Sequence, residues 1–261
     1  MRIQGGRRDP RGLLLLLRRG DGNSPQEQGL RSPAQNQLGW KSPLRSSSPT
    51  SMLQEGRTRG GRTKHGSGPR TYTVNLPSIQ RAMQAVGYHL KDQGLNLLIN
   101  NAGISSHATL CSLDSQEMLN VFATNVVGPL QVVKEFLPLL EQAAKGAGKE
   151  GVSCSRAAVI NISSKLGSIG LCLRVPEAPM YPYRASKAAQ NMVTRCLAAE
   201  LQDKGILCVA IHPGWVKTDM GTEEAPLTVE HSVRGILTVL ASLSQDTSGA
   251  FLDWEGNSLP W

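Results

Sequence analysis

One stretch of the sequence limits the folds and functions open to this chain. It is a short apolar strand followed by a helix that carries a tyrosine and, four residues later, a lysine. Val159, Ile160 and Ile162 belong to a β-branched run that ends in serine, which is typical of a buried strand. After a loop, Tyr183 and Lys187 are spaced so that both lie on one face of the predicted helix. The pattern predicts a phenol close to an ammonium group at the end of a buried strand.

This pairing is suited to moving a proton on and off an oxygen atom. A free tyrosine has a pKa of about 10, too high for easy proton exchange near neutral pH. A nearby cation and the positive end of the helix both favour the phenolate, so we expect Lys187 to lower the pKa of Tyr183. A serine hydroxyl at the end of the strand would hold a substrate carbonyl beside this phenol.

A Tyr-x-x-x-Lys spacing alone is a weak signal, but three other motifs accompany it in a fixed order. They are Asn-Asn-Ala-Gly at 100–103, Ser-Ser at 163–164 and His-Pro-Gly-Trp-Val-Lys-Thr at 212–218. Together they resemble the short-chain dehydrogenase/reductase family from about residue 74 to residue 261. The ending GAFLDWEGNSLPW is most similar to the small carbonyl reductases of the sniffer and C-factor type.

The resemblance implies an oxidoreductase with four catalytic residues. Tyr183 would give a proton to a carbonyl oxygen that Ser164 positions, and the reverse reaction would oxidise an alcohol. Lys187 would lower the pKa of the tyrosine and bind the nicotinamide ribose. Asn125 would hold a water that relays protons from the lysine to bulk solvent. An asparagine is unfavourable inside a helix, so its presence here needs an explanation. The alternative to a catalytic role for Asn125 is a structural role at a helix kink next to residues 128–129.

The choice among neighbouring side chains also follows from the resemblance. Ser164 rather than Ser163 fits the family's Ser-x-x-Gly pattern, which Gly167 completes. Tyr181 has no lysine four residues later, so it is rejected as the acid. The gap between Ser164 and Tyr183 is longer than in most members of the family, so we expect an unusual rim of the substrate pocket.

A nicotinamide cofactor is implied as well, and NADP is expected because the similar branch reduces carbonyls; NAD stays possible. Residues 101–103 would line the adenosine side of the cofactor, and residues 213–218 the nicotinamide side. Together with Tyr183 and Lys187, the cofactor-binding residues would be Asn101, Ala102, Gly103, Pro213, Gly214, Val216 and Thr218. His212 is expected to be structural, and no spacing of cysteine or histidine indicates a metal site.

Apolar runs that alternate with helical patterns predict an α/β fold, an open, doubly wound parallel sheet with ligand at the carboxyl ends of its strands. The strands are expected at 95–99, 159–162, 206–211 and 250–252. The helices are expected from 77–78 to 94, over 115–140, over 182–203 and over 228–243.

One expected motif is not found. The family places a Thr-Gly-x-x-x-Gly-x-Gly turn between a first strand and a helix, and the glycines at 56–68 have neither beside them. The phosphates would therefore lose their cradle, and the strand at 95–99 would lose the neighbour that covers its edge. Our hypothesis is a chain that keeps its catalytic residues but binds cofactor poorly. The alternative is a truncated form without activity, acting only by dimerisation through helices 115–140 and 182–203.

Residues 1–70 differ in composition from residues 71–261, the predicted partial Rossmann-type domain. They contain 14 basic and 4 acidic side chains among many Gly, Ser and Pro, which predicts a disordered basic tail. The formal net charge of +8 thus comes from the tail, so the folded part gives no case for nucleic-acid binding. Five cysteines without a Cys-x-x-Cys pair indicate a cytoplasmic protein. A mitochondrial location is the alternative, because transit peptides are also Arg- and Ser-rich.

Overall fold

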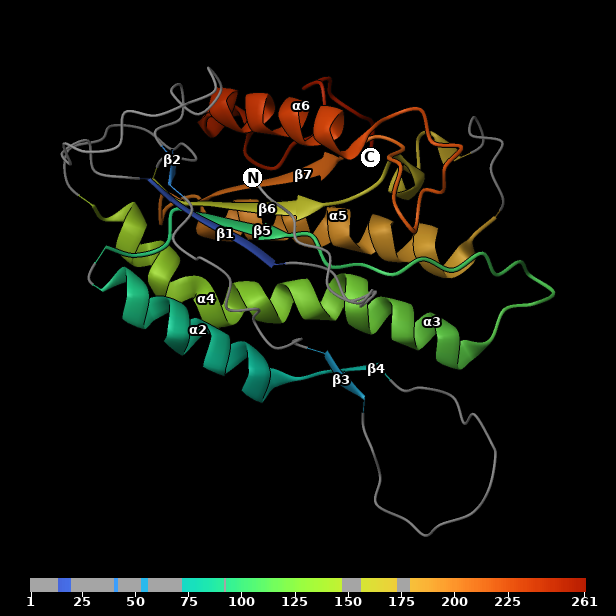
Figure 1. Ribbon diagram of the computed structural model, residues 1–261, viewed down its shortest axis with the longest axis horizontal. Helices are drawn as coiled ribbons and strands as arrows, with labels where there is room; N and C mark the ends of the chain where they lie inside the picture. The colour runs from blue at the N-terminus through green and yellow to red at the C-terminus, as the bar shows by residue number, and fades with distance from the viewer. Residues whose placement is uncertain are drawn as a thin grey trace, which may run out of the picture.

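The computed structural model describes residues 14–19, 40–41, 53–55, 72–91, 93–146, 156–172 and 179–261 (Figure 1). Among these residues a six-stranded sheet has the order β2-β1-β5-β6-β7-β8. Its strands are, in that order, Trp40–Lys41, Leu14–Arg19, Leu97–Asn100, Ala158–Ile162, Leu207–His212 and Phe251–Asp253. Two further strands, β3 (Leu53–Glu55) and β4 (Tyr72–Val74), pair antiparallel in a separate sheet.

The four strands from β5 to β8 are parallel. Leu98 lies opposite Val159 and Val159 opposite Cys208, so the strands are in register across the centre of the sheet. Parallel strands joined by helices bring all their carboxyl ends to one edge. This arrangement confirms the expected doubly wound α/β fold, and the chain segments that follow β5, β6 and β7 leave from the same edge (Figure 1).

Both faces of the parallel strands are covered, which is why their sequences read as continuous apolar runs rather than alternating ones. Leu98 and Val159 point into a core shared with α2, α4 and α5, whereas Ile99 and Ile160 point into a second core shared with α6. Figure 1 shows α6 on one side of the sheet and the other three helices on the opposite side. The bounds of these helices are Leu76–Leu90 (α2), Gly128–Ala144 (α4), Tyr181–Leu201 (α5) and Val229–Ser242 (α6).

Short polar side chains fix where two of these helices begin. The Asn75 side chain accepts a hydrogen bond from the Ser78 backbone N–H at 3.0 Å, with a proline in the first turn of α2. The Thr228 hydroxyl accepts from the His231 N–H at 3.2 Å, at the start of α6. The helix starts predicted at 77–78 and 228 are therefore correct to within one or two residues.

The helix expected over 115–140 is interrupted. It consists of α3 (Ser115–Phe122), a π-helical turn (Ala123–Val127) and α4. An unbroken α-helix would need the N–H of residue 129 to bond with the Asn125 carbonyl, and Pro129 has none. The Gly128 N–H instead reaches back five residues to the Ala123 carbonyl. The wider turn places Asn125 within it, as π-turns often do with functional residues.

The edge of β5 is covered, contrary to expectation. The backbone of β1 pairs antiparallel with β5, with Leu14 opposite Asn100 and Leu17 opposite Leu97. In the segment predicted to be disordered the structure thus describes three strands, β1 to β3, and the rest of that prediction lies outside the described residues. Because β1 is antiparallel, its carboxyl end lies at the amino edge of the four parallel strands. No helix in the described ranges is long and apolar enough to cross a bilayer.

Substitution of two glycines, one inside α2 and one in the connection between α2 and β5, should have opposite effects on stability. Gly94 has φ +72°, and a Cβ there would lie only 2.3 Å from the Ala143 backbone nitrogen, whereas a Cβ at Gly87 would meet only the Leu139 side chain at 3.7 Å. We expect Gly94→Ala to lower the free energy of unfolding by about 1–3 kcal/mol. Gly87→Ala, inside α2, should raise it by up to about 1 kcal/mol. Urea unfolding of both variants measures this, and equal effects would contradict the described connection.

Candidate active site

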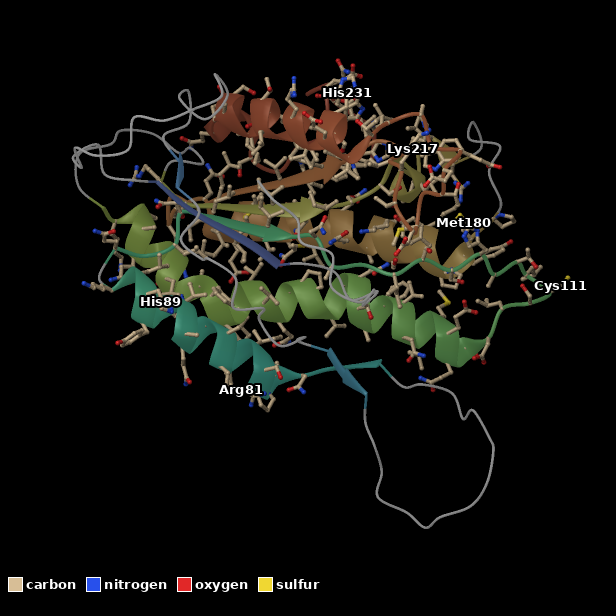
Figure 2. The ribbon with its side chains drawn as sticks, viewed as in Figure 1. Arg81, His89, Cys111, Met180, Lys217 and His231 are labelled. Carbon is tan, nitrogen blue, oxygen red and sulfur yellow. The ribbon has the colours of Figure 1, made fainter. Side chains whose placement is uncertain are left out.

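The candidate site is built from segments that leave the carboxyl ends of β5, β6 and β7. Asn101 to Gly103 follow β5, Ser163 and Ser164 follow β6, and residues 213–218 follow β7. The parallel register of the three strands brings these segments to one edge of the sheet. Figure 2 shows Met180, directly before α5, and Lys217, in the loop after β7, toward that same end of the molecule.

The two serines after β6 have different partners. Ser164 hydrogen-bonds the Tyr183 phenol. Its hydroxyl also accepts from the Leu166 N–H at 3.2 Å, which starts the 3₁₀ turn Lys165–Gly167. The Ser163 hydroxyl instead donates to Asn191 Oδ1 at 2.6 Å, on the buried side of α5. The predicted serine is therefore the one that lies beside the tyrosine.

A close approach between the 3₁₀ turn and α5 requires a glycine at position 167. A Cβ there would lie 2.6 Å from both the backbone carbonyl carbon and the Cβ of Lys187. Any other residue would push the turn away from the helix, and Ser164 with it. This contact is the physical reason for the Ser-x-x-Gly spacing.

Tyr183 lies in the first turn of α5, after a strained residue. Met180 has φ +44° and ψ +46°, a left-handed conformation that costs a non-glycine residue about 1 kcal/mol or more. The chain turns there so that Tyr181 is exposed while the Tyr183 phenol is buried beside Ser164. Rejecting Tyr181 on its spacing thus agrees with its orientation, whereas Met180 had no signal in the sequence.

The pKa of Tyr183 is shifted in the opposite direction from the one expected. Burial raises the pKa of the phenol above its ordinary value near 10, and the hydrogen bond with Ser164 only partly offsets this. The Lys187 ammonium lies 5.8 Å from the centre of the tyrosine ring and faces other partners. The expectation that Lys187 lowers this pKa is therefore wrong for this arrangement, and the phenol is protonated at neutral pH.

Lys187 is buried, and among the described residues its hydrogen-bond partners are neutral. Its Nζ donates to the Ile162 carbonyl at 2.7 Å and to Gln190 Oε1 at 3.0 Å. Neutral acceptors do not fully compensate the loss of hydration, so burial lowers the pKa of Lys187 to about 7. The lysine is thus close to half-charged at neutral pH. Gln190, which sequence reasoning missed, lies one turn beyond Lys187 on the same helix face.

Asn125 joins the motif after β5 to the helix that carries the tyrosine. Its Oδ1 accepts from the Ile104 N–H, and its Nδ2 donates to the Ile104 carbonyl and to the Ser186 hydroxyl, each at 2.9 Å. A Cβ at Gly103 would lie 3.4 Å from Asn125 Oδ1 and 3.8 Å from Lys187 Nζ. The structure therefore brings Gly103, Asn125 and Lys187 together, and Asn101 at the start of that motif is exposed.

A chain of hydrogen bonds between buried polar side chains joins the ends of β5 and β6 to α5. Asn100 Nδ2 donates to Asn161 Oδ1 at 2.8 Å, and Asn161 Nδ2 donates to the Thr194 hydroxyl at 2.9 Å. Thr194 in turn donates to the Gln190 carbonyl at 2.9 Å. Sequence reasoning named Asn100 only as part of the motif at 100–103 and missed Asn161 and Thr194 as site residues, although an asparagine in each of two apolar strands was a signal that could have been used. Such a network positions α5 against β5 and β6.

The loop after β7 contributes backbone shape rather than contacts to the tyrosine. The Pro213 carbonyl accepts from the Ser232 hydroxyl at 2.6 Å. Gly214 has φ +83°, and a Cβ there would lie 2.3 Å from the Leu227 side chain. Val216 forms a bridge with Leu227, and Thr218 is exposed, its hydroxyl accepting from the Gly221 N–H at 3.1 Å. The loop is thus tied to α6 and to the segment before it.

His212, at the end of β7, is buried, and its Nδ1 has no hydrogen-bond partner in the part of the chain that the structure describes. Burial lowers its pKa to about 4, and the nearby Lys165 acts in the same direction. An imidazole that stays neutral above pH 5 fits the structural role predicted for it. Within the described residues no group of three His, Cys, Asp or Glu side chains could hold a metal ion.

Comparison with known proteins gives consistent matches over the same part of the chain. A family model described as short chain dehydrogenase matches residues 70–227. The C-signal protein of Myxococcus xanthus is 36% identical over 180 residues, which cover 69% of this chain and 100% of that protein.

Solved structures give the same result. An NADPH-bound carbonyl reductase from chicken fatty liver is 48% identical, with a TM-score of 0.67 over 71% of this chain and 73% of that one. The carbonyl reductase Sniffer of D. melanogaster is 41% identical, with a TM-score of 0.68 over 72% of this chain and 75% of that one.

The burial of Lys187 predicts a pH dependence of stability. Its pKa is about 7 in the folded chain against an ordinary 10.5, so the unfolded chain binds more protons between these values. The free energy of unfolding should therefore rise with pH above 7, by up to about 2 kcal/mol at pH 9, and this rise should be absent in Lys187→Met. Urea unfolding at pH 7, 8 and 9 measures it; above pH 9 the buried Cys208 and Tyr183 act in the opposite sense. The same increase in the free energy of unfolding with pH in both proteins would show that Lys187 is not its cause.

Proposed function

This chain belongs to the short-chain dehydrogenase/reductase family, and on that premise we propose that it reduces a carbonyl compound to an alcohol with NADPH. The observation that carries the proposal is the hydrogen bond between Ser164 and Tyr183, with Lys187 one helical turn further on. These side chains lie at the carboxyl edge of a parallel sheet, where this fold class binds its ligands. The same residues would serve the reverse reaction.

The residues at this edge fit the nicotinamide half of the cofactor. The absence of a Cβ at Gly103 leaves space directly beside Asn125 and Lys187, and the backbone at Gly214 has a conformation that favours glycine. In its charged form Lys187 has three N–H groups and two hydrogen-bond acceptors, so one N–H remains for a ribose hydroxyl. When bound, NADPH would supply a hydride for the carbonyl carbon.

Tyr183 is the proposed proton donor. Its raised pKa keeps a proton on the phenol at neutral pH, so the residue is in the protonated form that reduction requires, although the same shift makes it a weaker acid than free tyrosine. As the O–H bond of the phenol breaks, its proton passes to the carbonyl oxygen and the phenolate is left. Ser164, already hydrogen-bonded to the phenol, would hold that oxygen in place.

Lys187 and Asn125 support this step. The partly neutral lysine can take up or release a proton near pH 7, so it suits a relay that returns the proton to the phenolate. The Asn125 side chain has both N–H groups and its oxygen engaged by Ile104 and Ser186. We therefore propose that this side chain fixes the site, and that a relay water would bind it through the remaining lone pair of Oδ1.

NADP is the preferred cofactor because the carbonyl reductase solved with NADPH is 48% identical to this chain. The family's Gly-rich turn for the cofactor phosphates is not found in this sequence. A turn that follows β1 would begin at the edge opposite to the candidate site, since β1 runs antiparallel to β5. We propose that this chain holds the nicotinamide end but lacks the phosphate cradle of the family, so that it binds NADPH weakly.

The orientation of β1 also favours a second candidate function, a catalytically impaired form that acts by association. Large apolar side chains are exposed along α3, the π-turn, α4 and α5. They are Leu119, Val127, Leu130, Tyr181 and Met192. We propose these helices as the interface of a homodimer or of a dimer with a full-length relative, which sedimentation of the purified chain alone and in mixture would test.

Substitution of two neighbouring tyrosines tests the proposed chemistry. Tyr183→Phe removes the proton donor, so kcat/KM for carbonyl reduction at saturating NADPH should fall at least about 100-fold. Its affinity for NADPH should change by no more than about tenfold, since one hydrogen bond is removed. Tyr181→Phe, on the exposed side of the same helix turn, is the matched control and should retain full activity. Retained activity in Tyr183→Phe would refute the assignment.

The proposed lack of a phosphate cradle predicts that NADPH binds little more tightly than its nicotinamide half alone. Reduced nicotinamide mononucleotide lacks the adenosine half of NADPH, so the two should bind within about tenfold of each other if that half finds no partners. Charge-assisted hydrogen bonds to the phosphates would make NADPH bind more than about 100-fold tighter. Isothermal titration with both ligands decides between these outcomes.

A further inference from the structure

The last residues of the chain fold back along β8. Asp253 closes the turn, because its Oδ1 accepts from the N–H groups of Glu255 and Asn257, each at 2.9 Å. The returning segment then pairs antiparallel with β8: Ser258 bridges Leu252, and the Leu259 N–H donates to the Phe251 carbonyl at 2.8 Å. This geometry carries residues 258–261 across the end of the sheet toward the loop that follows Ser164.

Three hydrogen bonds join this segment to that loop, one of them a long contact of 3.4 Å from the Ser168 hydroxyl to the Trp261 carbonyl oxygen. The buried Ser168 hydroxyl donates to the Pro260 carbonyl at 2.6 Å, and the Gly170 N–H donates to the Trp261 carbonyl oxygen at 2.7 Å. The fit is close, since a Cβ at Gly170 would lie 3.2 Å from the Pro260 Cβ. The segment is therefore docked on the loop by its backbone as well as by its side chains.

The Trp261 indole anchors the segment. Its ring stacks on Phe251, with centroids 5.4 Å apart and planes 24° apart. The Arg195 guanidinium lies 5.7 Å from the indole centroid, a cation–π distance, and donates to the Gly249 carbonyl at 3.2 Å. Trp261 thus ties the end of β8 and α5 to the loop.

The loop leads directly back to Ser164. The 3₁₀ turn Lys165–Gly167 separates Ser164 from Ser168, and Gly167 is packed against the Lys187 backbone. The Ser168 N–H donates to the Lys165 carbonyl at 3.0 Å, and the Leu171 N–H to the Ser168 hydroxyl at 3.2 Å. A displacement of Ser168 would therefore move the turn that holds the Ser164 hydroxyl against Tyr183.

We propose that residues 258–261 form a strap that positions the loop 168–172 and, through it, Ser164 against the carbonyl substrate. The proposal rests on the proposed function, because it assigns the loop to the substrate. The segments proposed for the cofactor follow β5 and β7, whereas the loop held by the strap follows β6 and includes Cys172, whose sulfur lies 4.0 Å from an Arg184 nitrogen, next to Tyr183. The strap thus acts on the carbonyl side of the site rather than on the nicotinamide side.

Trp261→Ala and Trp261→Phe form the matched pair that tests the strap. Hydrogen exchange comes first, in the full chain well below its melting temperature, and it requires no activity. In Trp261→Ala the amides of Gly170 and Leu171 should exchange at least about tenfold faster, while those of β6 and α6 stay unchanged. Trp261→Phe keeps a ring on Phe251 and should restore most of the protection.

Steady-state kinetics with a carbonyl substrate then tests whether loosening the loop weakens binding of the carbonyl. In Trp261→Ala the KM for the carbonyl should rise at least about fivefold, a loss of about 1 kcal/mol of binding, with the affinity for NADPH unchanged. A merely structural role would lower the active fraction and hence kcat, and would leave this KM unchanged. Trp261→Phe should return the KM to near its original value.

Two results would overturn the strap. One is unchanged exchange at Gly170 in Trp261→Ala, and the other is faster exchange with an unchanged KM for the carbonyl. A wild-type chain that binds NADPH but reduces no carbonyl would instead refute the proposed function, while the exchange experiment would still decide whether the strap holds the loop.

Discussion

The candidate site depends on burying the Lys187 ammonium among neutral groups. Its acceptors are the Ile162 carbonyl at the end of β6 and the Gln190 side chain on α5, so the lysine fastens the helix to the sheet. Two glycines make this possible: Gly167 lets the 3₁₀ turn approach the lysine backbone, and Gly103 leaves room beside its Nζ. The absence of a carboxylate keeps the pKa near 7, where a group that exchanges protons is useful.

The burial of Tyr183 shifts its pKa in the opposite direction from the one that its spacing to the lysine indicates. A phenol desolvated beside Ser164 holds its proton at neutral pH, and the fixed partners of the lysine prevent it from acting as a close counter-ion. This protonated state is the one that we propose for the reduction of a carbonyl. Bound cofactor would add charge and hydrogen-bond partners at this edge, and the family relationship makes NADPH the reductant to test.

Much of the fold could be predicted because it follows from local patterns. The apolar runs gave the four parallel strands, and the Tyr183–Lys187 spacing gave one helix face. What failed depends on tertiary structure. The pKa of Tyr183 is set by depth of burial, and the antiparallel β1 by pairing across about 80 residues. The partners of Asn161 and Gln190 likewise become neighbours only in the folded chain. The π-turn is by contrast local, and it agrees with the helix kink at residues 128–129 that was the alternative explanation for Asn125.

We propose that NADPH bound at the carboxyl edge of the sheet gives a hydride to a carbonyl carbon. The most direct measurement uses NADPH deuterated at the transferable C4 position, with the folded chain at saturating cofactor and a panel of aldehydes, ketones and quinones. Mass spectrometry of the products should show deuterium on the carbinol carbon of at least one aldehyde- or ketone-derived alcohol. Demonstrated binding of NADPH without deuterium transfer to any member of the panel would contradict the account.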